Sequence, residues 1–364
     1  MQFYLKKLEC YGIRGIALQW FESYLTDREQ YVDFDGIESS KLRITCGVPQ
    51  GSILGPLLFL IYINDIASVS KELFSLLFAD DSNMFVTGKN CNELIDIMNR
   101  EMVKVVHWLN SNKLSLNLTK THFIIFKRAR TKVNINKILM VNNFEISKVR
   151  VTKFLGIMID EHLYFTDHIQ YIKGKISRGI GIIYKAKRLL NKETLLTLYY
   201  SFIYPYFNYC LTVWGNTFKT QIDILQKLQN RIMRLITGAG WRDKSAPIFN
   251  QTKVLNVYQM YVYSVQLLNY KFHFKQLPEI FNSFYAYNYE IHGYYTRQQS
   301  NFHTPINLSR TGTKTLKSTG VLINNFFDKH ISHQCTYSTY KNKIRQFILS
   351  NDTKVLINKI YKYQ

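Results

Sequence analysis

The stretch Leu76-Leu77-Phe78-Ala79-Asp80-Asp81-Ser82-Asn83-Met84-Phe85-Val86 places two adjacent carboxylates between two apolar runs. Side chains alternate faces along a β-strand, so neighbouring aspartates suit a hairpin turn better than the middle of a strand. Two strands that meet at Asp80 and Asp81 would hold negative charge at the edge of a sheet, where oxygen ligands bind a hard divalent cation. Because Asp is also a common turn residue, an ordinary acidic turn is the alternative for this pair taken alone.

The composition indicates a polyanionic partner. The chain has 364 residues and a formal net charge of +22, from 47 Lys and Arg against 25 Asp and Glu. This length predicts two or more domains. So large a positive excess favours nucleic acid over a membrane surface as the partner, and a merely soluble basic protein is the alternative. The 26 Tyr and 24 Phe residues fit base stacking and packed cores equally well.

The cysteines indicate a reducing compartment. They are odd in number, scattered and without a C-x-x-C pair, and no histidine ligand spacing accompanies them, which argues against a disulfide framework and against zinc. The longest apolar run, around 53–63, is interrupted by Gly55 and Pro56 and is too short to span a bilayer, so no membrane partner is expected. The cysteines are Cys10, Cys46, Cys91, Cys210 and Cys335.

A helix, a strand pair and a glycine-rich loop are predicted before the Asp80-Asp81 hairpin. The helix covers 14–25, and strands near 30–34 and 41–46 are joined by a turn at Asp35-Gly36. The loop Gly47-Val48-Pro49-Gln50-Gly51-Ser52 carries glycines and a proline, which let its backbone approach a ligand closely. Pro56 suits the first turn of a helix that runs to about residue 66, and amides beside a helix start can hold phosphate.

Helices and strands alternate irregularly after the hairpin. A helix is predicted over 92–110, a strand over 121–127 after the polar turn 117–120, and another strand or hairpin over 151–159. This irregular order up to about residue 160 predicts an α+β domain.

A small helical bundle is predicted next. Isoleucines at helical spacing mark a helix over 169–183, Asn191 caps a second helix, and Gly238 closes a third that covers 225–235. No acidic residue lies between His168 and Asn191. The cations of this segment form either a solvated face or a nucleic-acid face, and the net charge favours the second. They are Lys173, Lys175, Arg178, Lys185, Lys187 and Arg188.

The sequence pattern of residues 241–364 supports fewer structural predictions. Helices are predicted around 254–272 and 340–360, with a polar, loop-like region between them. Within that region, residues 296–320 hold four cations and no carboxylate, so contact with phosphate is expected. These cations are Arg297, Arg310, Lys314 and Lys317.

The order of these motifs resembles the reverse transcriptases of non-LTR retrotransposons, and jockey-like elements in particular. A glycine loop, an apolar helix, an Asp-Asp hairpin, a helix, a lysine turn and a further hairpin follow one another, and the resemblance covers at least residues 10–240. It rests on Tyr11-Gly12-Ile13-Arg14-Gly15, Ser23-Tyr24-Leu25, residues 47–59, Ile63-Asn64-Asp65, Phe78-Ala79-Asp80-Asp81, Phe154-Leu155-Gly156, Tyr204-Pro205 and Trp214-Gly215.

The resemblance implies catalytic roles for three residues. Asp80 and Asp81 correspond to the second metal-binding box of the polymerase palm, where a Mg²⁺ pair holds the primer 3′-oxygen and the triphosphate of a dNTP. Lys120 lies where the family places a lysine near the leaving pyrophosphate, as a general acid. An ordinary solvent-exposed turn lysine is the alternative for Lys120.

The resemblance also implies contacts with substrate and nucleic acid. Pro49, Gln50 and Gly51 correspond to the segment that touches the incoming nucleotide and the template. Phe154-Leu155-Gly156 resembles the primer-grip hairpin. The basic helical bundle is then the thumb, which follows the backbone of the RNA template and the DNA primer.

Parts of the family pattern are not found in this sequence. In the family, the other metal-binding aspartate of the palm lies on a strand before the motif at 11–15, and residues 2–9 contain no aspartate. The fingers subdomain and the endonuclease domain are not found either. We therefore expect an N-terminally truncated element, with a partial palm over 1–160, a helical thumb over 161–240 and a mostly helical region of unknown role over 241–364.

Two function hypotheses follow from this reasoning. The first is RNA-directed DNA polymerisation by two-metal nucleotidyl transfer, of which this chain carries a part. The second is a catalytically inactive nucleic-acid-binding remnant, because two metal ions need several carboxylates and one aspartate pair supplies too few. The partial palm is expected to expose an apolar sheet face. Action in the nucleus is implied by the resemblance alone.

Overall fold

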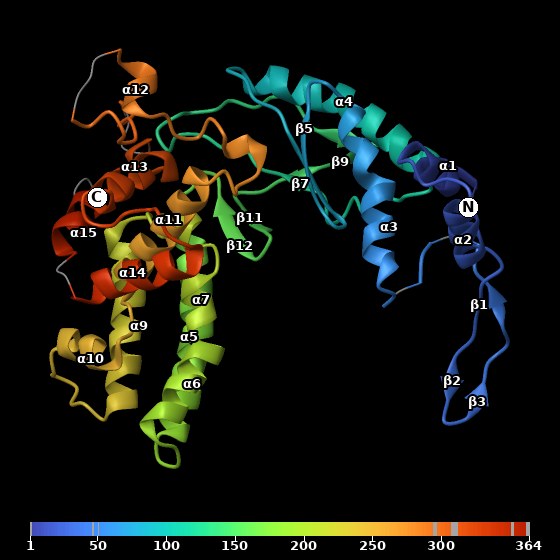
Figure 1. Ribbon diagram of the computed structural model, residues 1–364. Helices are drawn as coiled ribbons and strands as arrows, with labels where there is room; N and C mark the ends of the chain where they lie inside the picture. The colour runs from blue at the N-terminus through green and yellow to red at the C-terminus, as the bar shows by residue number, and fades with distance from the viewer. Residues whose placement is uncertain are drawn as a thin grey trace. The chain divides into compact units, whose positions relative to one another are not determined.

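The computed structural model describes residues 2–45, 47–49, 51–293, 297–306, 312–350 and 353–361. The chain divides into two compact units: unit 1 comprises Met1–Phe123 and Arg130–Val149, and unit 2 comprises Ile124–Ala129 and Arg150–Gln364. Helices and short, mostly antiparallel two-stranded sheets make up both units, which confirms the α+β class (Figure 1). Among the described residues, no helix is both long and apolar enough to cross a bilayer.

Unit 1 alternates helices with short two-stranded sheets. Its helices are α1 (Gln2–Cys10), α2 (Ile16–Leu25), α3 (Leu54–Ile63), the 3₁₀ helix η1 (Asn64–Ser68) and α4 (Cys91–Ser111). Its strands are β1 (Glu29–Gln30), β2 (Asp33–Phe34), β3 (Ile37–Glu38), β4 (Leu42–Arg43), β5 (Phe74–Phe78), β6 (Asp81–Phe85), β7 (His122–Phe123), β8 (Met140–Val141), β9 (Phe144–Glu145) and β10 (Ser147–Lys148).

Most of the elements predicted for this unit are present. The helices predicted over 14–25 and 92–110 are α2 and α4, and the predicted strand pair forms as β1–β4 with the β2–β3 hairpin at its tip. The strand predicted over 121–127 is wrong beyond Phe123, because only β7 pairs there, with β10 in parallel. The backbone of Lys127 instead donates to the Glu161 carbonyl within unit 2.

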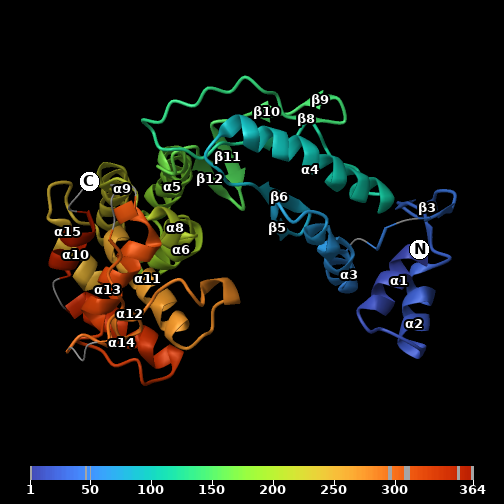
Figure 2. The ribbon, with the colours of Figure 1, turned by 90° about the horizontal axis from the view of Figure 1, so that it is seen from above.

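The β5–β6 hairpin has one packed face and one open face. Leu77 and Met84 pack against a core formed by α4, η1 and β8, and Figure 2 shows α4 running beside β8. The opposite face of β5 carries Phe74, Leu76 and Phe78, whose side chains are 57%, 41% and 60% exposed. The expected apolar sheet face is therefore present in unit 1, and such faces mark contact sites for other molecules or for further chain.

Unit 2 is built mainly from helices. The strands of its described residues are β11 (Val151–Phe154) and β12 (Ile157–Asp160). Its helices are α5 (Thr166–Ala186), α6 (Lys192–Phe202), α7 (Tyr204–Asn208), α8 (Leu211–Trp214), α9 (Lys219–Thr237), α10 (Ser245–Thr252), α11 (Val257–His273), η2 (Glu279–Phe281), α12 (Asn288–Ile291), η3 (Gly312–Lys314), α13 (Leu316–Phe327), α14 (Tyr337–Ser350) and α15 (Lys354–Tyr361).

Helices are present in each range predicted for unit 2, but the range 340–360 holds two helices, α14 and α15, and the helices α10, α12 and α13 were not predicted. Asn191 caps α6 through a bond from the Thr194 N–H, and α5 and α9 lie side by side (Figure 1). Helix α13 falls in a region predicted to be loop-like, so that prediction is wrong. Its buried side is mixed in polarity, because Thr319 and Asn324 are buried beside Val321, and this mixture conceals the helical pattern. The basic residue Arg310 lies outside the described residues.

A large hydrophobic cluster forms the main core of the described part of unit 2, and a smaller one contains Tyr285, Phe302 and Val321. The large cluster runs from Ile157 to Tyr361 and contains the fully buried side chains of Trp214, Tyr199 and Tyr261. Gln229, at the centre of α9, is also buried and bonds to Tyr199 Oη, to the Leu255 carbonyl and to the Val257 N–H. The helices of 161–240 therefore share their core with those of 241–361.

Candidate functional site

Asp80 and Asp81 lie at the tip of the β5–β6 hairpin, which confirms the predicted turn. Phe78 pairs with Asp81, so Ala79 and Asp80 are the two central residues, and Ala79 takes a positive φ of 50°. Both aspartates are exposed, and within the described part of the chain neither has an ion-pair partner. Their oxygens are the donors that Mg²⁺ prefers, so these residues fit a hard divalent cation.

The glycine loop is tight because its backbone takes left-handed conformations. Gly47 and Gly51 have φ values of 85° and 81°, which glycine adopts at no steric cost. Between them, Pro49 is half-buried, and its carbonyl accepts from Ser52 Oγ at 2.8 Å. Gln50, which was predicted to contact the nucleotide, lies outside the described residues.

Two side chains anchor this loop to its neighbours. Arg28 Nη2 donates to the Gly47 carbonyl at 2.5 Å, and Arg28 Nε donates to the Leu25 carbonyl at the end of α2. Ser52 Oγ accepts from the Gly55 N–H at 3.0 Å, in the first turn of α3. Arg28 and Ser52 therefore hold Gly47 and Pro49 between the end of α2 and the start of α3.

Lys120 lies in the predicted polar turn. Its side chain is exposed, and its N–H bonds to the side-chain oxygen and the carbonyl of Asn117. The turn is thus built by Asn117, and the Lys120 amine is left accessible. Among the described residues, no hydrogen bond or ion pair joins Lys120 to Asp80, Asp81 or the glycine loop, so its part in catalysis stays a prediction.

The predicted primer-grip residues form the turn of the β11–β12 hairpin in unit 2. Phe154 pairs with Ile157, and the two central residues, Leu155 and Gly156, have φ values of 43° and 85°. Positive φ at both positions is the requirement of a type I′ turn, for which leucine is a poor choice. Leu155 therefore holds a strained backbone conformation at the tip of this hairpin.

Tyr209 holds this turn in place, and the sequence reasoning missed it. Tyr209 Oη donates to the Leu155 carbonyl at 2.6 Å, and Trp214 Nε1 donates to the Tyr209 carbonyl at 2.8 Å. A Cβ on Gly156 would lie 3.3 Å from Tyr209 Cε1. The neighbouring motifs Tyr204-Pro205 and Trp214-Gly215 were the available signal, because they frame Tyr209 in the sequence.

Replacing Leu155 with asparagine is expected to stabilise unit 2 by about 1 kcal/mol, because asparagine tolerates positive φ. Replacing Gly156 with alanine is expected to destabilise it by at least about 1 kcal/mol, since alanine is strained there and approaches Tyr209. Urea denaturation followed by circular dichroism measures both changes. A destabilising Leu155→Asn change would contradict the strain assigned to this turn.

A stripe of cations and an aromatic ring runs along the open face of α5. Residues at helical spacings of three and four lie on one face of a helix, and Tyr171, Lys175, Arg178, Ile182 and Lys185 share such a face (hereafter the α5 stripe). Lys175 Nζ lies 5.5 Å from the Tyr171 ring centroid, and Lys153 Nζ on β11 lies 6.0 Å from it. In the described ranges, no carboxylate pairs with these cations.

The other predicted cations lie apart from this stripe. Lys173 is exposed on another side of α5, at the margin of its buried face. Lys187 follows the end of α5, where its amine lies 5.0 Å from the Tyr184 ring centroid, and Arg188 comes next in the chain. The structure therefore brings together only part of the predicted nucleic-acid face.

The structure also brings together His273, Asp328 and His333, which the sequence reasoning did not connect. Their potential ligand atoms all lie within 4.8 Å of one another. The sequence offered no local signal for this group, because His273 ends α11 while Asp328 and His333 follow α13. The predicted absence of a zinc site was argued from cysteine spacing and did not consider these residues.

Comparisons with known proteins support the resemblance given by the motifs. Residues 1–159 match the family described as reverse transcriptase (RNA-dependent DNA polymerase). The chain is 26% identical over 245 residues to a probable RNA-directed DNA polymerase from transposon X-element of Drosophila melanogaster, covering 65% of this chain and 26% of that protein. This match to reverse transcriptases of non-LTR retrotransposons confirms the predicted resemblance.

Other relatives come from the same kind of element. The RNA-directed DNA polymerase from mobile element jockey of Drosophila melanogaster is 26% identical over 245 residues, covering 64% of this chain and 26% of that protein. A Pol polyprotein from type-1 retrotransposable element R1 of Bradysia coprophila is 26% identical over 227 residues, covering 61% of this chain and 22% of that protein. The chain thus spans about a quarter of these relatives, and no solved structure matches it.

Proposed function

Because residues 1–159 carry the match to the reverse transcriptase family, we propose that this chain is part of an RNA-directed DNA polymerase of a non-LTR retrotransposon. The reaction is transfer of a nucleotide from a dNTP to the 3′-hydroxyl of a DNA primer, directed by an RNA template. The observation that carries the proposal is the exposed Asp80-Asp81 pair at the tip of the β5–β6 hairpin, inside the matched segment.

Asp80 and Asp81 act as metal ligands in this proposal. Both carboxylates are exposed at one hairpin tip, so their oxygens can meet a cation and a triphosphate together. Mg²⁺ bound there, as one or two ions, offsets the negative charge that develops during phosphoryl transfer. Among the residues described, no basic side chain competes for these two carboxylates.

The remaining site residues position substrate and nucleic acid. Pro49, Gln50 and Gly51 contact the incoming nucleotide, and Lys120 donates a proton to the leaving pyrophosphate. Phe154, Leu155 and Gly156 hold the primer end, with the turn kept in shape by Tyr209. The α5 stripe follows the phosphate backbone of template and primer, as exposed cations beside an aromatic ring can do. On this proposal residues 1–160 act as palm and 161–240 as thumb.

Primer extension on an RNA template with Mg²⁺ tests the proposal. We expect extension by the chain to fall by at least about 1,000-fold in Asp81→Asn, because an amide cannot replace a carboxylate as ligand. Asp35→Asn is the matched control, since Asp35 is an exposed aspartate at the tip of the β2–β3 hairpin and carries no proposed role. Equal activity of Asp81→Asn and Asp35→Asn would overturn the assignment of the metal ligands.

A second candidate function is nucleic-acid binding without catalysis, and the α5 stripe favours it. If the wild-type chain extends no primer but binds RNA in a salt-dependent manner, this second function holds. The plot of log affinity against log salt has a negative slope, and we expect Lys175→Ala and Arg178→Ala each to make it shallower by about 0.7 to 1. Lys227→Ala, which removes an exposed lysine on α9, is the control and is expected to leave the slope unchanged.

Equal slopes for the stripe variants and Lys227→Ala would show that the cations bind no phosphate. A filter-binding or fluorescence-anisotropy titration at several salt concentrations measures all three variants. The same protein preparations serve the extension assay, so activity and binding are compared directly.

A further inference from the structure

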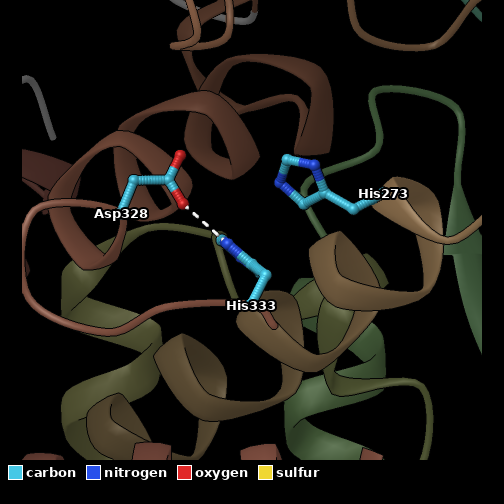
Figure 3. A group of neighbouring side chains, drawn as sticks. All are labelled: His273, Asp328 and His333. Atoms are coloured by element: carbon cyan, nitrogen blue, oxygen red, sulfur yellow. Dashed lines mark ion pairs between the residues drawn. The ribbon is translucent and has the colours of Figure 1, made fainter. Parts of the chain in front are cut away.

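Three ionisable side chains of unit 2 converge from different segments. His273 is the last residue of α11, Asp328 directly follows α13, and His333 lies in the connection to α14. Figure 3 shows the His273 imidazole facing the Asp328–His333 pair. Asp328 Oδ1 and His333 Nδ1 are 3.1 Å apart, and one ligand atom from each of the three residues lies within 4.8 Å of the others.

Two polar atoms of this group are buried without hydrogen bonds. His333 Nε2 and Asp328 Oδ1 have no hydrogen-bond partner among the described residues. Such orphaned groups are rare in native proteins and commonly mark a missing ion or water.

Neighbouring side chains fix the orientation of both imidazoles. The His273 ring stacks on Phe302 with centroids 4.9 Å apart, and the His333 ring stacks on Tyr340 at 5.1 Å. Stacking of this kind holds each ring plane before any ligand arrives. The ring planes of the two histidines are therefore pre-arranged, which lowers the cost of ordering them on binding.

Polar contacts around the group match those that orient metal ligands. Asn324 Nδ2 donates to Asp328 Oδ2 at 2.6 Å, which leaves Asp328 Oδ1 directed at His333. His273 bonds through Nδ1 to Tyr287 Oη at 2.8 Å and through Nε2 to Asn324 Oδ1 at 3.1 Å. Hydrogen bonds on one imidazole nitrogen and on the second carboxylate oxygen are typical of histidine and aspartate that bind metals, and the other nitrogen of His273 would exchange its present hydrogen bond for the ion.

We propose that His273, Asp328 and His333 form a binding site for a divalent transition metal ion, with Zn²⁺ as the favoured ion. Two imidazole nitrogens and one carboxylate oxygen suit Zn²⁺, whereas Mg²⁺ prefers oxygen ligands alone. Ligand atoms about 2.0 Å from a tetrahedral ion lie roughly 3.3 Å apart. The 3.1 Å separation of Asp328 Oδ1 and His333 Nδ1 is close to this spacing.

This site is chemically distinct from the Asp80-Asp81 pair and has a different role. Its ligands tie the end of α11 to the connection between α13 and α14, so a bound ion fastens three segments of unit 2. The role of the ion is therefore structural, and part of residues 241–361 serves to bind it. It does not depend on polymerase activity.

Metal titration of the full chain tests the proposal. After removal of metal with a chelator, Zn²⁺ is expected to bind with one-to-one stoichiometry and to raise the thermal midpoint by mass action. Co²⁺ is expected to give the visible absorption bands of a tetrahedral nitrogen–oxygen site. Absence of saturable binding by either ion would overturn the proposal.

Variants locate the ion. Asp328→Asn, which keeps the shape of the side chain, and His333→Gln are each expected to weaken Zn²⁺ binding by at least about 100-fold, and Tyr287→Phe by about 10-fold. His330→Gln is the control, because His330 is an exposed histidine three positions before His333 and outside the group. Far-UV circular dichroism of each metal-free variant checks that it folds.

Equal loss of affinity in His330→Gln and His333→Gln, or unchanged affinity in Asp328→Asn, would place the ion elsewhere in the chain. If His333→Gln fails to fold, the folded Asp328→Asn and Tyr287→Phe variants decide the question. The wild-type chain is titrated with Zn²⁺ before and after its cysteine thiols are chemically modified. Identical Zn²⁺ affinities of the two forms exclude the cysteines as ligands.

Discussion

Replacing Trp214 with alanine is expected to destabilise unit 2 by about 4 kcal/mol, the range for deleting a fully buried tryptophan. Trp214 has no exposed surface and packs in the large hydrophobic cluster of the unit. Its Nε1 donates to the Tyr209 carbonyl, and its ring meets His168 edge-on with centroids 5.4 Å apart. The change therefore leaves a cavity and also removes the hydrogen bond on the Tyr209 carbonyl.

Urea denaturation of the wild type and of two variants measures this effect. Trp241→Ala is the matched control, because Trp241 is 82% exposed and its loss is expected to change stability by less than about 0.5 kcal/mol. Trp214→Phe keeps a ring but loses the N–H, so an intermediate loss of about 2 kcal/mol is expected. Similar stability of Trp214→Ala and Trp241→Ala would contradict the role given to Trp214.

The Trp214 contact also bears on the proposed primer grip. Trp214 holds the Tyr209 backbone, and the Tyr209 hydroxyl holds the Leu155 carbonyl at the β11–β12 turn. Loss of the indole N–H is therefore expected to loosen this turn. The core residue Trp214 thus supports the candidate primer-grip residue Leu155 through Tyr209.

His168 is expected to make the stability of unit 2 depend on pH, with a contribution of about 3 kcal/mol. Burial lowers the pKa of His168 to about 4 in the folded chain. The Met158 N–H donates to His168 Nδ1, so a proton on that nitrogen would break this bond. Between about pH 6.5 and 4 the unfolded chain binds the proton and the folded chain does not. Stability is therefore complete above pH 6.5 and falls as the pH drops towards 4.

The difference between the wild type and His168→Gln isolates this contribution, because glutamine offers an acceptor but does not titrate. Urea midpoints are measured from pH 7.5 to about 4.5, and the wild type is expected to lose more stability than the variant over this range. His292→Gln, an exposed histidine of unit 2, is expected to follow the wild type. Parallel curves for the wild type and His168→Gln would refute the prediction.

Local patterns in the sequence were sufficient to predict most elements. Asp80 and Asp81 between two apolar runs predicted a hairpin turn, and isoleucines at helical spacing predicted α5. Glycines and a proline predicted the tight loop that contains Pro49. Each of these features depends on neighbours in the chain, so single-sequence reasoning was able to find them.

Features that depend on distant residues were not predicted. Helix α13 was missed because Thr319 and Asn324 on its buried side find their partners, Tyr261 and His273, on another helix. Tyr209 and the group of His273, Asp328 and His333 were missed for a similar reason, since their contacts join segments far apart in the sequence. Periodicity carries no information about which helix a polar side chain will meet.

The contact of α15 with α8 has a consequence for how the protein forms during synthesis. Tyr361 at the end of α15 is buried, and its hydroxyl donates to the Gly215 carbonyl directly after α8. Leu356 and Ile360 of α15 belong to the same cluster as Ile157. On the ribosome, residues 150–240 therefore emerge with part of their core uncovered, and unit 2 reaches its final packing only when residues 354–361 have left the exit tunnel.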